Sequence, residues 1–115
     1  MFICTGNTCR SPMAQVFFEN QVRSMPEFLP YTVGSAGIRA QAGQKSAPIL
    51  ERILMTRGLS LENHRARLLT PAIVDQAVAM ICATSAHKSF LEKNFVNLPK
   101  ICISFFEFGG DIADP

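Results

Sequence analysis

The feature that most constrains how this chain can fold is the stretch Cys4–Pro12, which reads CTGNTCRSP. The apolar residues Met1–Ile3 before it are typical of the end of a buried strand. Pro12 fits the first position of a helix, because its fixed φ suits a helix and its missing N–H would have no partner there. The stretch is therefore predicted to be a loop between a strand and a helix N-terminus, where backbone N–H groups favour an anion.

Four residues of this loop suit a phosphate in particular. Gly6 lets the backbone approach a ligand closely, and Asn7 tolerates a left-handed turn. Arg10 carries a planar fork of N–H donors that matches two oxygens of a phosphate group. Cys4, surrounded by these donors, is expected to exist as a thiolate, and a thiolate in a phosphate cradle is a nucleophile for phosphorus. The alternative interpretation is a small buried thiol followed by an unrelated arginine.

Composition bounds the class of protein. With 115 residues, 48% of them hydrophobic and 17% charged, the chain is expected to form one domain over residues 1–115. The net charge of +2, without a cluster of Lys and Arg, predicts no nucleic-acid partner. No apolar run could span a membrane and no signal peptide opens the chain, so we expect a cytoplasmic protein without a membrane partner. Cysteines at positions 4, 9, 82 and 102 lack the paired spacing of a zinc site, so we expect free thiols, no metal and no cofactor.

Hydrophobic periodicity and turn residues predict strands that alternate with helices. After the strand that ends at residue 3, helices are expected at about 12–22, 46–58, 71–77 and 86–95, and strands at 31–33, 78–83 and 100–104. Thr70 is predicted to cap the third helix, and the strand Val78–Ala83 is predicted to be buried on both faces. Such alternation implies right-handed crossovers and a parallel sheet with helices on both sides. Phe105–Pro115 is predicted to be a loop.

The stretch Cys4–Ser11 resembles the signature of the low-molecular-weight protein tyrosine phosphatase family, Cys-x-Gly-Asn-x-Cys-Arg-Ser, at every defined position. Gly34–Gly37 resembles the family's Ser-Ala-Gly turn, His64–Arg67 its His-x-x-Arg segment and Asp111–Pro115 its Asp-Pro loop. The resemblance implies a three-layer, Rossmann-like α/β fold with a four-stranded parallel sheet in the order 2-1-3-4. Family members continue past Asp-Pro into a final helix, so we expect that this domain lacks that helix and is truncated at the C-terminus.

The resemblance also implies the roles of three catalytic residues. Cys4 is the nucleophile that forms a phosphocysteine intermediate, Arg10 stabilises charge on the phosphoryl oxygens, and Asp114 is the general acid and then the general base. The residues implied to bind phosphate are Thr5, Gly6, Asn7, Thr8, Cys9, Arg10 and Ser11. Without the resemblance, an Asp-Pro pair would be interpreted as an ordinary turn.

Other residues are implied to support this chemistry. Asn7, Ser35 and His64 correspond to family residues that hydrogen-bond one another and hold the loop, and Ser11 to a hydroxyl that bonds the thiolate. Taken alone, His64 would be a packing or surface histidine and Ser11 a helix cap. The resemblance implies a reversible disulfide between Cys4 and Cys9 under oxidants.

Four further residues are interpreted without the resemblance. Asp111 is taken to be a loop residue only and His87 an exposed helix residue. Cys82 and Cys102 are predicted to fill the core from strands.

The substrate is predicted from Thr8. Tyrosine phosphatases of this family often carry a bulky apolar residue there, whereas the protein-arginine phosphatase branch reads CTGNTCRS, as this chain does. We therefore expect a phosphorylated protein as partner, with phosphoarginine favoured over phosphotyrosine, and inorganic phosphate as product. The alternatives are a tyrosine phosphatase, an arsenate reductase that uses Cys82 in a redox relay, and a non-catalytic phosphate-binding module. Ser89 occupies the place where such a relay would need a resolving cysteine.

Overall fold

The computed structural model describes residues 1–114 and contains one parallel sheet of four strands in the order β2-β1-β3-β4. The strands are β1 (Phe2–Cys4), β2 (Ser35–Gly37), β3 (Ala79–Cys82) and β4 (Ile101–Ser104). The helices are α1 (Arg10–Val22), α2 (Pro48–Met55), α3 (Pro71–Gln76) and α4 (Ser85–Asn94), with 3-10 turns η1 (Pro26–Phe28) and η2 (Phe105–Phe108). The predicted α/β class and strand order are confirmed.

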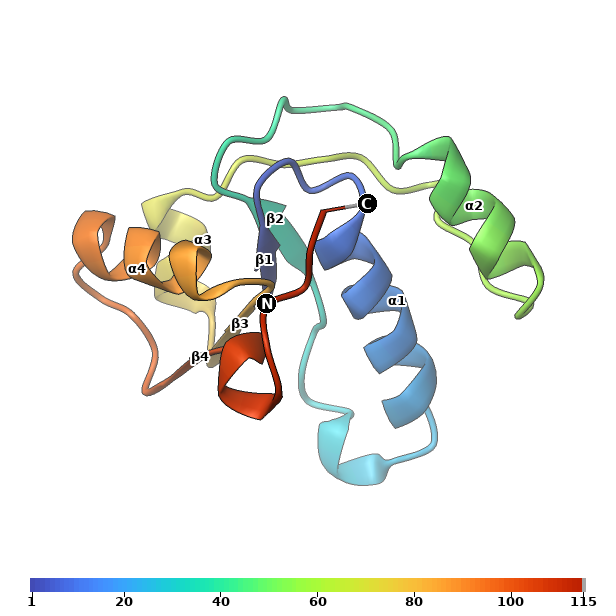
Figure 1. The fold of residues 1–115 in the computed structure, drawn as a ribbon. Coiled ribbons are helices and arrows are strands. Elements are labelled where there is room, and N and C mark those ends of the chain that lie inside the picture. Colours follow the sequence, from blue (N-terminus) through green and yellow to red (C-terminus); the bar gives the residue numbers. More distant parts are fainter. Residues whose placement is uncertain (115) are drawn as a thin grey trace.

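The helices lie on both sides of the sheet (Figure 1). α1 covers one side, while α3 and α4 cover the other and α2 stands beyond α1. The main core lies on the α3 and α4 side and consists of Ile3, Ala36, Leu69, Val74, Met80, Cys82 and Leu91. A smaller core, built on Leu50, Leu54 and Leu61, joins α2 to the apolar side of α1. This arrangement leaves the carboxyl end of β1 at the top of the sheet, between the layers.

The helix boundaries agree with the sequence to within a few residues. Thr70 caps α3 as predicted, because its hydroxyl accepts a hydrogen bond of 3.3 Å from the backbone N–H of Ile73. α1 begins at Arg10, so the prediction that Pro12 is its first residue was wrong. The helix accommodates Pro12 in its first turn, because the first N–H groups of a helix have no intrahelical acceptor. The earlier start places Arg10 in the helix N-terminus itself.

The strand predicted at 31–33 was also wrong, because β2 is formed by the small residues Ser35–Gly37. A Cβ atom on Gly37 would lie 2.5 Å from the Thr5 carbonyl oxygen and 2.9 Å from the Asn7 nitrogen. Only a strand without side-chain bulk can approach the loop after β1 so closely. Tertiary packing therefore outweighs the β-propensity of Tyr31–Val33.

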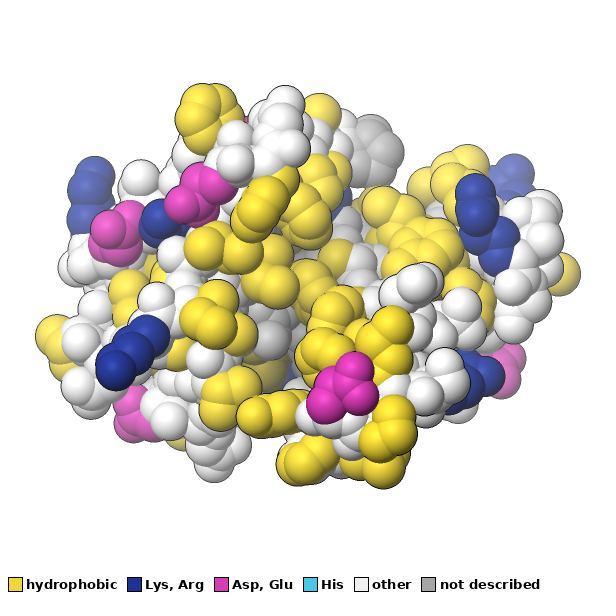
Figure 2. Space-filling view, turned by 90° about the horizontal axis from the view of Figure 1, so that it is seen from below, with side chains coloured by type: hydrophobic (Ala, Val, Ile, Leu, Met, Phe, Trp, Pro, Cys, Tyr) yellow, Lys and Arg dark blue, Asp and Glu magenta, His cyan; other side chains and the backbone are white. Residues whose placement is uncertain are grey.

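β3 is not buried on both faces, contrary to its apolar sequence. Met80 and Cys82 are buried, but Ile81 on the α1 side is only half-buried, and Val78 before the strand is 65% exposed. The reason is that α1 packs on β1 and β2 and leaves the far half of the sheet uncovered. The result is an apolar groove, and Figure 2 shows hydrophobic side chains gathered on this side of the molecule. The groove is lined by Phe2, Ala14, Phe17, Phe18, Gln21, Ile81, Ile103, Phe105 and Phe108.

None of the helices formed by residues 1–114 has the length and apolar character that crossing a membrane requires.

Candidate active site

The loop that the sequence singles out lies at the carboxyl end of a central strand. β1 ends at Cys4 and α1 begins at Arg10, and β1 is flanked by β2 and β3. We call residues 4–11 the phosphate loop. In open parallel sheets ligands bind outside the carboxyl ends of strands where the strand order reverses, and this loop occupies that place. Cys4 is buried at its base.

Two groups point at the sulfur of Cys4. The backbone N–H of Asn7 donates to Sγ over 3.3 Å, and Oγ of Ser11 lies 2.9 Å from Sγ. Ser11 Oγ already accepts a hydrogen bond of 2.8 Å from Nδ2 of Asn7, which leaves the hydroxyl proton free for the sulfur. Both donors stabilise negative charge on the sulfur, and both lie within the loop itself.

Asn7 is the centre of the hydrogen-bond network that shapes the loop. It is fully buried and has a left-handed φ of 56°, a conformation that asparagine tolerates. Its Nδ2 donates to Ser11 and also to Oγ of Ser35 over 2.9 Å, while its Oδ1 accepts from the backbone N–H of Arg67 over 3.0 Å. Nε2 of His64 donates to the Asn7 carbonyl over 2.7 Å. The structure thus brings together Asn7, Ser11, Ser35 and His64.

Sequence reasoning missed two further supports of the loop. Gln15 of α1 accepts a hydrogen bond of 2.7 Å from the Ser35 hydroxyl, so Ser35 is held from both sides. After β2, the backbone N–H groups of Ile38 and Arg39 donate to the carbonyls of Cys4 and Thr5 over 3.0 and 2.9 Å. The close approach that makes these bonds possible depends on Gly37, whose only sequence signal is its place in the Ser-Ala-Gly turn.

Arg10 lies between the phosphate loop and the end of the described chain. Its side chain is only 9% exposed. Nη1 donates to the carbonyl of Ile112 over 3.0 Å, and Nη2 donates to the Thr5 hydroxyl over 3.4 Å. Nε has no hydrogen-bond partner within residues 1–114, although Oδ1 of Asp114 lies 3.6 Å away. The guanidinium therefore retains donor capacity for an anion.

We call residues 111–114 the acid loop. Asp111, expected to be only a loop residue, is its anchor: Oδ1 accepts from the backbone N–H of Ser85 over 2.7 Å and Oδ2 from the Ser85 hydroxyl over 3.2 Å. The backbone N–H of Ile112 donates to the carbonyl of Ala83 over 2.9 Å. Asp114 lies beside Arg10 with its side chain 72% exposed. Pro115, the second residue of the predicted Asp-Pro pair, lies outside the described residues.

His87 is not the exposed helix residue that the sequence suggested, because it is only 4% exposed. Nδ1 accepts from the backbone N–H of Thr84 over 3.1 Å, and Nε2 lies 2.8 Å from the Thr5 hydroxyl. Burial, with a further contribution from Arg10, lowers the pKa of His87. Its position three residues after Thr84 is that of the partner in a capping box, which was the signal available in the sequence.

The other cysteines differ from Cys4 in position and environment. Cys9 precedes α1 and is half-buried, and burial together with the nearby Asp114 carboxylate raises the pKa of its thiol. Cys82 lies wholly inside the core, where burial raises the pKa of its thiol to about 12. Such a thiol is a poor nucleophile for a redox relay. Burial also raises the pKa of Cys102, which is half-buried in β4.

Thr8 and Gly6 complete the phosphate loop. The carbonyl of Thr8 accepts a hydrogen bond of 2.8 Å from the backbone N–H of Ala47, which ties the loop to the segment before α2. A Cβ atom on Gly6 would meet only the Thr8 hydroxyl, at 3.7 Å, so no neighbouring protein atom requires glycine there. Close approach of a ligand stays a prediction for Gly6.

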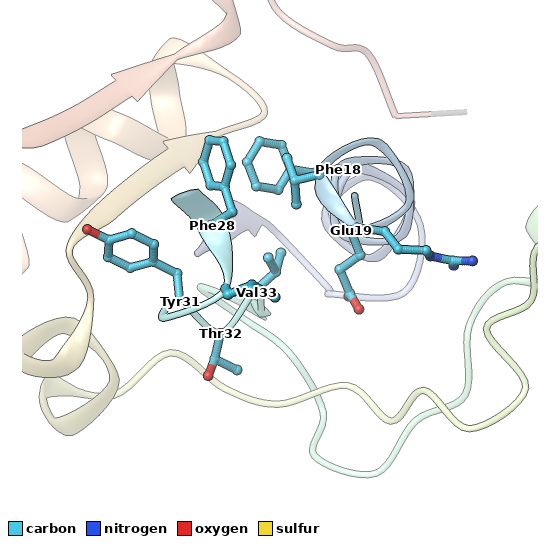
Figure 3. A pocket seen from close by; sticks show the side chains of 9 residues that line it. Phe18, Glu19, Phe28, Tyr31, Thr32 and Val33 are labelled. Carbon is cyan, nitrogen blue, oxygen red and sulfur yellow. The ribbon is translucent and has the colours of Figure 1, made fainter. Parts of the chain in front are cut away.

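A second pocket lies at the far end of α1 (Figure 3). Its walls include Phe18, Phe28, Tyr31 and Val33, and no residue of the phosphate loop lines it. Phe18 and Phe28 meet edge to face, with ring centroids 5.7 Å apart. Its lining includes no cysteine, histidine or lysine. It offers aromatic surface rather than a nucleophile.

A thiol at the end of a central parallel strand, held among N–H donors and an arginine at a helix N-terminus, defines a cysteine-based phosphate site on an α/β fold. The family model described as low molecular weight phosphotyrosine protein phosphatase matches residues 1–114. The chain belongs to this family, whose members act on phosphorylated proteins.

Individual relatives agree with this assignment. The chain is 34% identical to the protein-arginine-phosphatase of Geobacillus stearothermophilus, an alignment that covers all of this chain and 76% of the relative. It is 33% identical to the probable low molecular weight protein-tyrosine-phosphatase EpsP of Ralstonia nicotianae, again over all of this chain and 76% of the relative. Among solved structures, a cysteine-to-serine mutant of the YwlE arginine phosphatase with a phosphorylated active-site serine superposes with a TM-score of 0.88 at 30% identity. That match covers 99% of this chain and 76% of the other.

Proposed function

We propose that this chain is a cysteine-dependent protein phosphatase with Cys4 as its nucleophile. The observation that carries the proposal is the environment of the Cys4 sulfur. The Asn7 N–H and the Ser11 hydroxyl both meet it, and the Asn7 side chain orients that hydroxyl towards it. Donors fixed around one sulfur stabilise a thiolate, which is the reactive form.

The proposed reaction has two steps. The Cys4 thiolate attacks phosphorus, so that an S–P bond forms while the bond from phosphorus to the leaving group breaks. Asp114 gives its proton to that leaving group, and Arg10 stabilises the phosphoryl oxygens. Water, deprotonated by Asp114, then attacks phosphorus and releases inorganic phosphate and the thiolate. The Ser11 hydroxyl stabilises the departing sulfur.

Hydrolysis of para-nitrophenyl phosphate tests this proposal. The wild type should turn over the substrate, and Cys4→Ser should abolish turnover while retaining vanadate binding, because the cradle remains. Cys102→Ser is the matched control, since it removes a half-buried thiol in β4 and should leave the rate unchanged. Phosphate or vanadate binding by a wild type without turnover would instead indicate a binding module. Full activity of Cys4→Ser would refute the mechanism.

For the substrate, we propose phosphoarginine on a protein in preference to phosphotyrosine. Support comes from Thr8, whose compact side chain carries a hydroxyl. This hydroxyl can hydrogen-bond to water and to the polar guanidinium of a phosphoarginine. The relative from Geobacillus stearothermophilus is named a protein-arginine-phosphatase, which agrees with this choice. The EpsP relative is named a probable tyrosine phosphatase, which agrees with the alternative that this chain acts on phosphotyrosine.

Thr8→Ile tests the substrate preference. Isoleucine keeps the branching of threonine but replaces the hydroxyl with apolar bulk. The ratio of kcat/KM for phosphotyrosine peptides to that for matched phosphoarginine peptides should rise by at least about tenfold. Thr32→Ile, in an exposed segment, is the control and should leave the ratio unchanged. An unchanged ratio in Thr8→Ile, or a wild type that prefers phosphotyrosine, would favour the tyrosine assignment.

We also propose redox control by a reversible Cys4–Cys9 disulfide, in an enzyme that works in the reducing cytoplasm. Both residues belong to one short loop and are free thiols. Mild peroxide should inactivate the enzyme and a thiol should restore it, whereas Cys9→Ser should make the loss irreversible. Mass spectrometry that finds only sulfonic acid at Cys4 of the wild type would count against the disulfide.

A further inference from the structure

His87 lies outside the phosphate loop and the acid loop, yet it contacts the first of them. It comes from the first turn of α4, and Thr5 follows β1, so the two residues are 82 positions apart in the chain. The imidazole is almost wholly buried, with Nε2 2.8 Å from the Thr5 hydroxyl. His87 takes no part in the two-step reaction proposed above.

The hydrogen bonds define which tautomer is present. The backbone N–H of Thr84 can only donate, so Nδ1 of His87 is its acceptor over 3.1 Å. The Thr84 hydroxyl lies 2.9 Å from the same nitrogen and accepts from the His87 backbone N–H, so its own proton is free to donate to Nδ1 as well. A neutral ring then carries its proton on Nε2, which donates to the Thr5 hydroxyl. The charged groups that act on the ring are Arg10 of α1, and Asp111 and Asp114 of the acid loop. Burial and Arg10 lower the pKa of His87, which agrees with a neutral ring.

The Thr5 hydroxyl connects this ring to Arg10. Its oxygen accepts from His87 Nε2 and, over a longer 3.4 Å, from Nη2 of Arg10. With both acceptor directions used, the hydroxyl proton is left for a third partner, such as a phosphate oxygen. His87 of α4 therefore fixes the rotation of the Thr5 side chain. Through the Thr5 hydroxyl it also orients the Nη2 edge of the Arg10 guanidinium.

We propose that His87 is a positioning residue, which orients the Thr5 hydroxyl and through it the Arg10 guanidinium at the phosphate loop. This inference rests on the proposed phosphatase function. The simpler alternative is that His87 only caps α4, where it completes a capping box with Thr84.

Two substitutions separate these roles. His87→Gln keeps an acceptor for the Thr84 N–H, as in a usual capping box, and supplies an N–H donor towards Thr5. His87→Asn keeps an acceptor near the helix end but is too short to reach Thr5. We expect kcat/KM for para-nitrophenyl phosphate to fall about tenfold in His87→Asn and to stay within about twofold of wild type in His87→Gln.

Thr5→Val allows a second test, because it removes the Thr5 hydroxyl and keeps the shape of the side chain. If His87 acts through Thr5, adding His87→Asn to Thr5→Val should cause little further loss. Equal rates for the Gln and Asn variants, or losses that multiply in the double variant, would overturn the proposal. Thermal unfolding of each variant ensures that rates are compared in folded protein.

Inorganic phosphate binding, followed by calorimetry, keeps this test separate from the proposed function. A wild type without turnover would defeat the phosphatase proposal, whereas the His87 proposal would still predict weaker phosphate binding in His87→Asn than in His87→Gln. Equal phosphate affinities in such a protein would overturn it.

Discussion

The two loops that meet at Arg10 are built in different ways. In the phosphate loop Asn7 and Ser11 are buried, and their side chains are tied to one another, to Ser35 and to the backbone of Arg67. The acid loop is largely exposed, and its described contacts are those of Asp111 with Ser85, Ile112 with Ala83, and Arg10 with Ile112 and Asp114.

The difference indicates which of the proposed catalytic groups are already positioned in the folded protein. The donors around Cys4 are positioned by a buried network that folding must form in any case, so the proposed nucleophile and the N–H groups around it need little reorganisation. Asp114, the proposed proton donor, belongs to a loop that is attached to that structure by fewer and more exposed hydrogen bonds. Changes in the phosphate loop should therefore affect binding, rate and stability together, whereas changes in the acid loop should affect the rate alone.

Arg10→Lys should give the largest effect. A lysine ammonium cannot reproduce the planar fork, so phosphate binding and turnover should both suffer, with kcat/KM down about a thousandfold. Steady-state kinetics and vanadate titration measure the two losses. Arg23→Lys, at the exposed far end of α1, is the control. Retention of vanadate affinity in Arg10→Lys would contradict the assignment of Arg10 to the phosphate.

Asp114→Asn should give a smaller and more selective effect. Without a proton donor, kcat for phosphorylated peptides should fall about a hundredfold, and vanadate affinity should stay close to wild type. Asp75→Asn, an exposed residue of α3, is the control. If Asp114→Asn weakened vanadate binding as much as turnover, the acid loop would contribute to anion binding as well as to the rate, contrary to the difference described above.

Stability should distinguish the loops to a lesser degree. Asn7→Ala removes three side-chain hydrogen bonds and places alanine at a φ of 56°, so the free energy of unfolding should fall by about 3 kcal/mol. Asp111→Ala, in an exposed position, should cost less than about 1 kcal/mol. Denaturant unfolding measures both, with the exposed Asn20→Ala as control. Equal losses in Asn7→Ala and Asp111→Ala would show that the loops are supported alike.

The same division explains what the sequence could predict. The phosphate loop is a local motif, so eight consecutive residues were enough to single out Cys4, Asn7, Arg10 and Ser11 as candidates. The strand order followed from the family resemblance. Local reasoning failed at β2, where small residues are required by contact with the phosphate loop rather than by propensity.

His87 and Asp111 were misjudged for a related reason. His87 contacts Thr5, 82 positions away, and Asp111 contacts Ser85, 26 positions away. Their roles depend on tertiary neighbours that single-sequence periodicity does not contain. The exposure of Ile81 and Val78 is a further case, because a run of apolar residues does not reveal how far α1 extends across the sheet.

Detection of a phosphoryl group on Cys4 would test the proposed mechanism most directly. In Asp114→Asn, para-nitrophenyl phosphate should still react, because its leaving group needs little help from an acid, while the attack of water should lack its base. Rapid-quench mass spectrometry should then find one phosphoryl group on Cys4, which accumulates in Asp114→Asn and is absent from Cys4→Ser. Turnover of the substrate without any phosphorylated Cys4, or with the phosphoryl group on another residue, would refute the proposed role of Cys4.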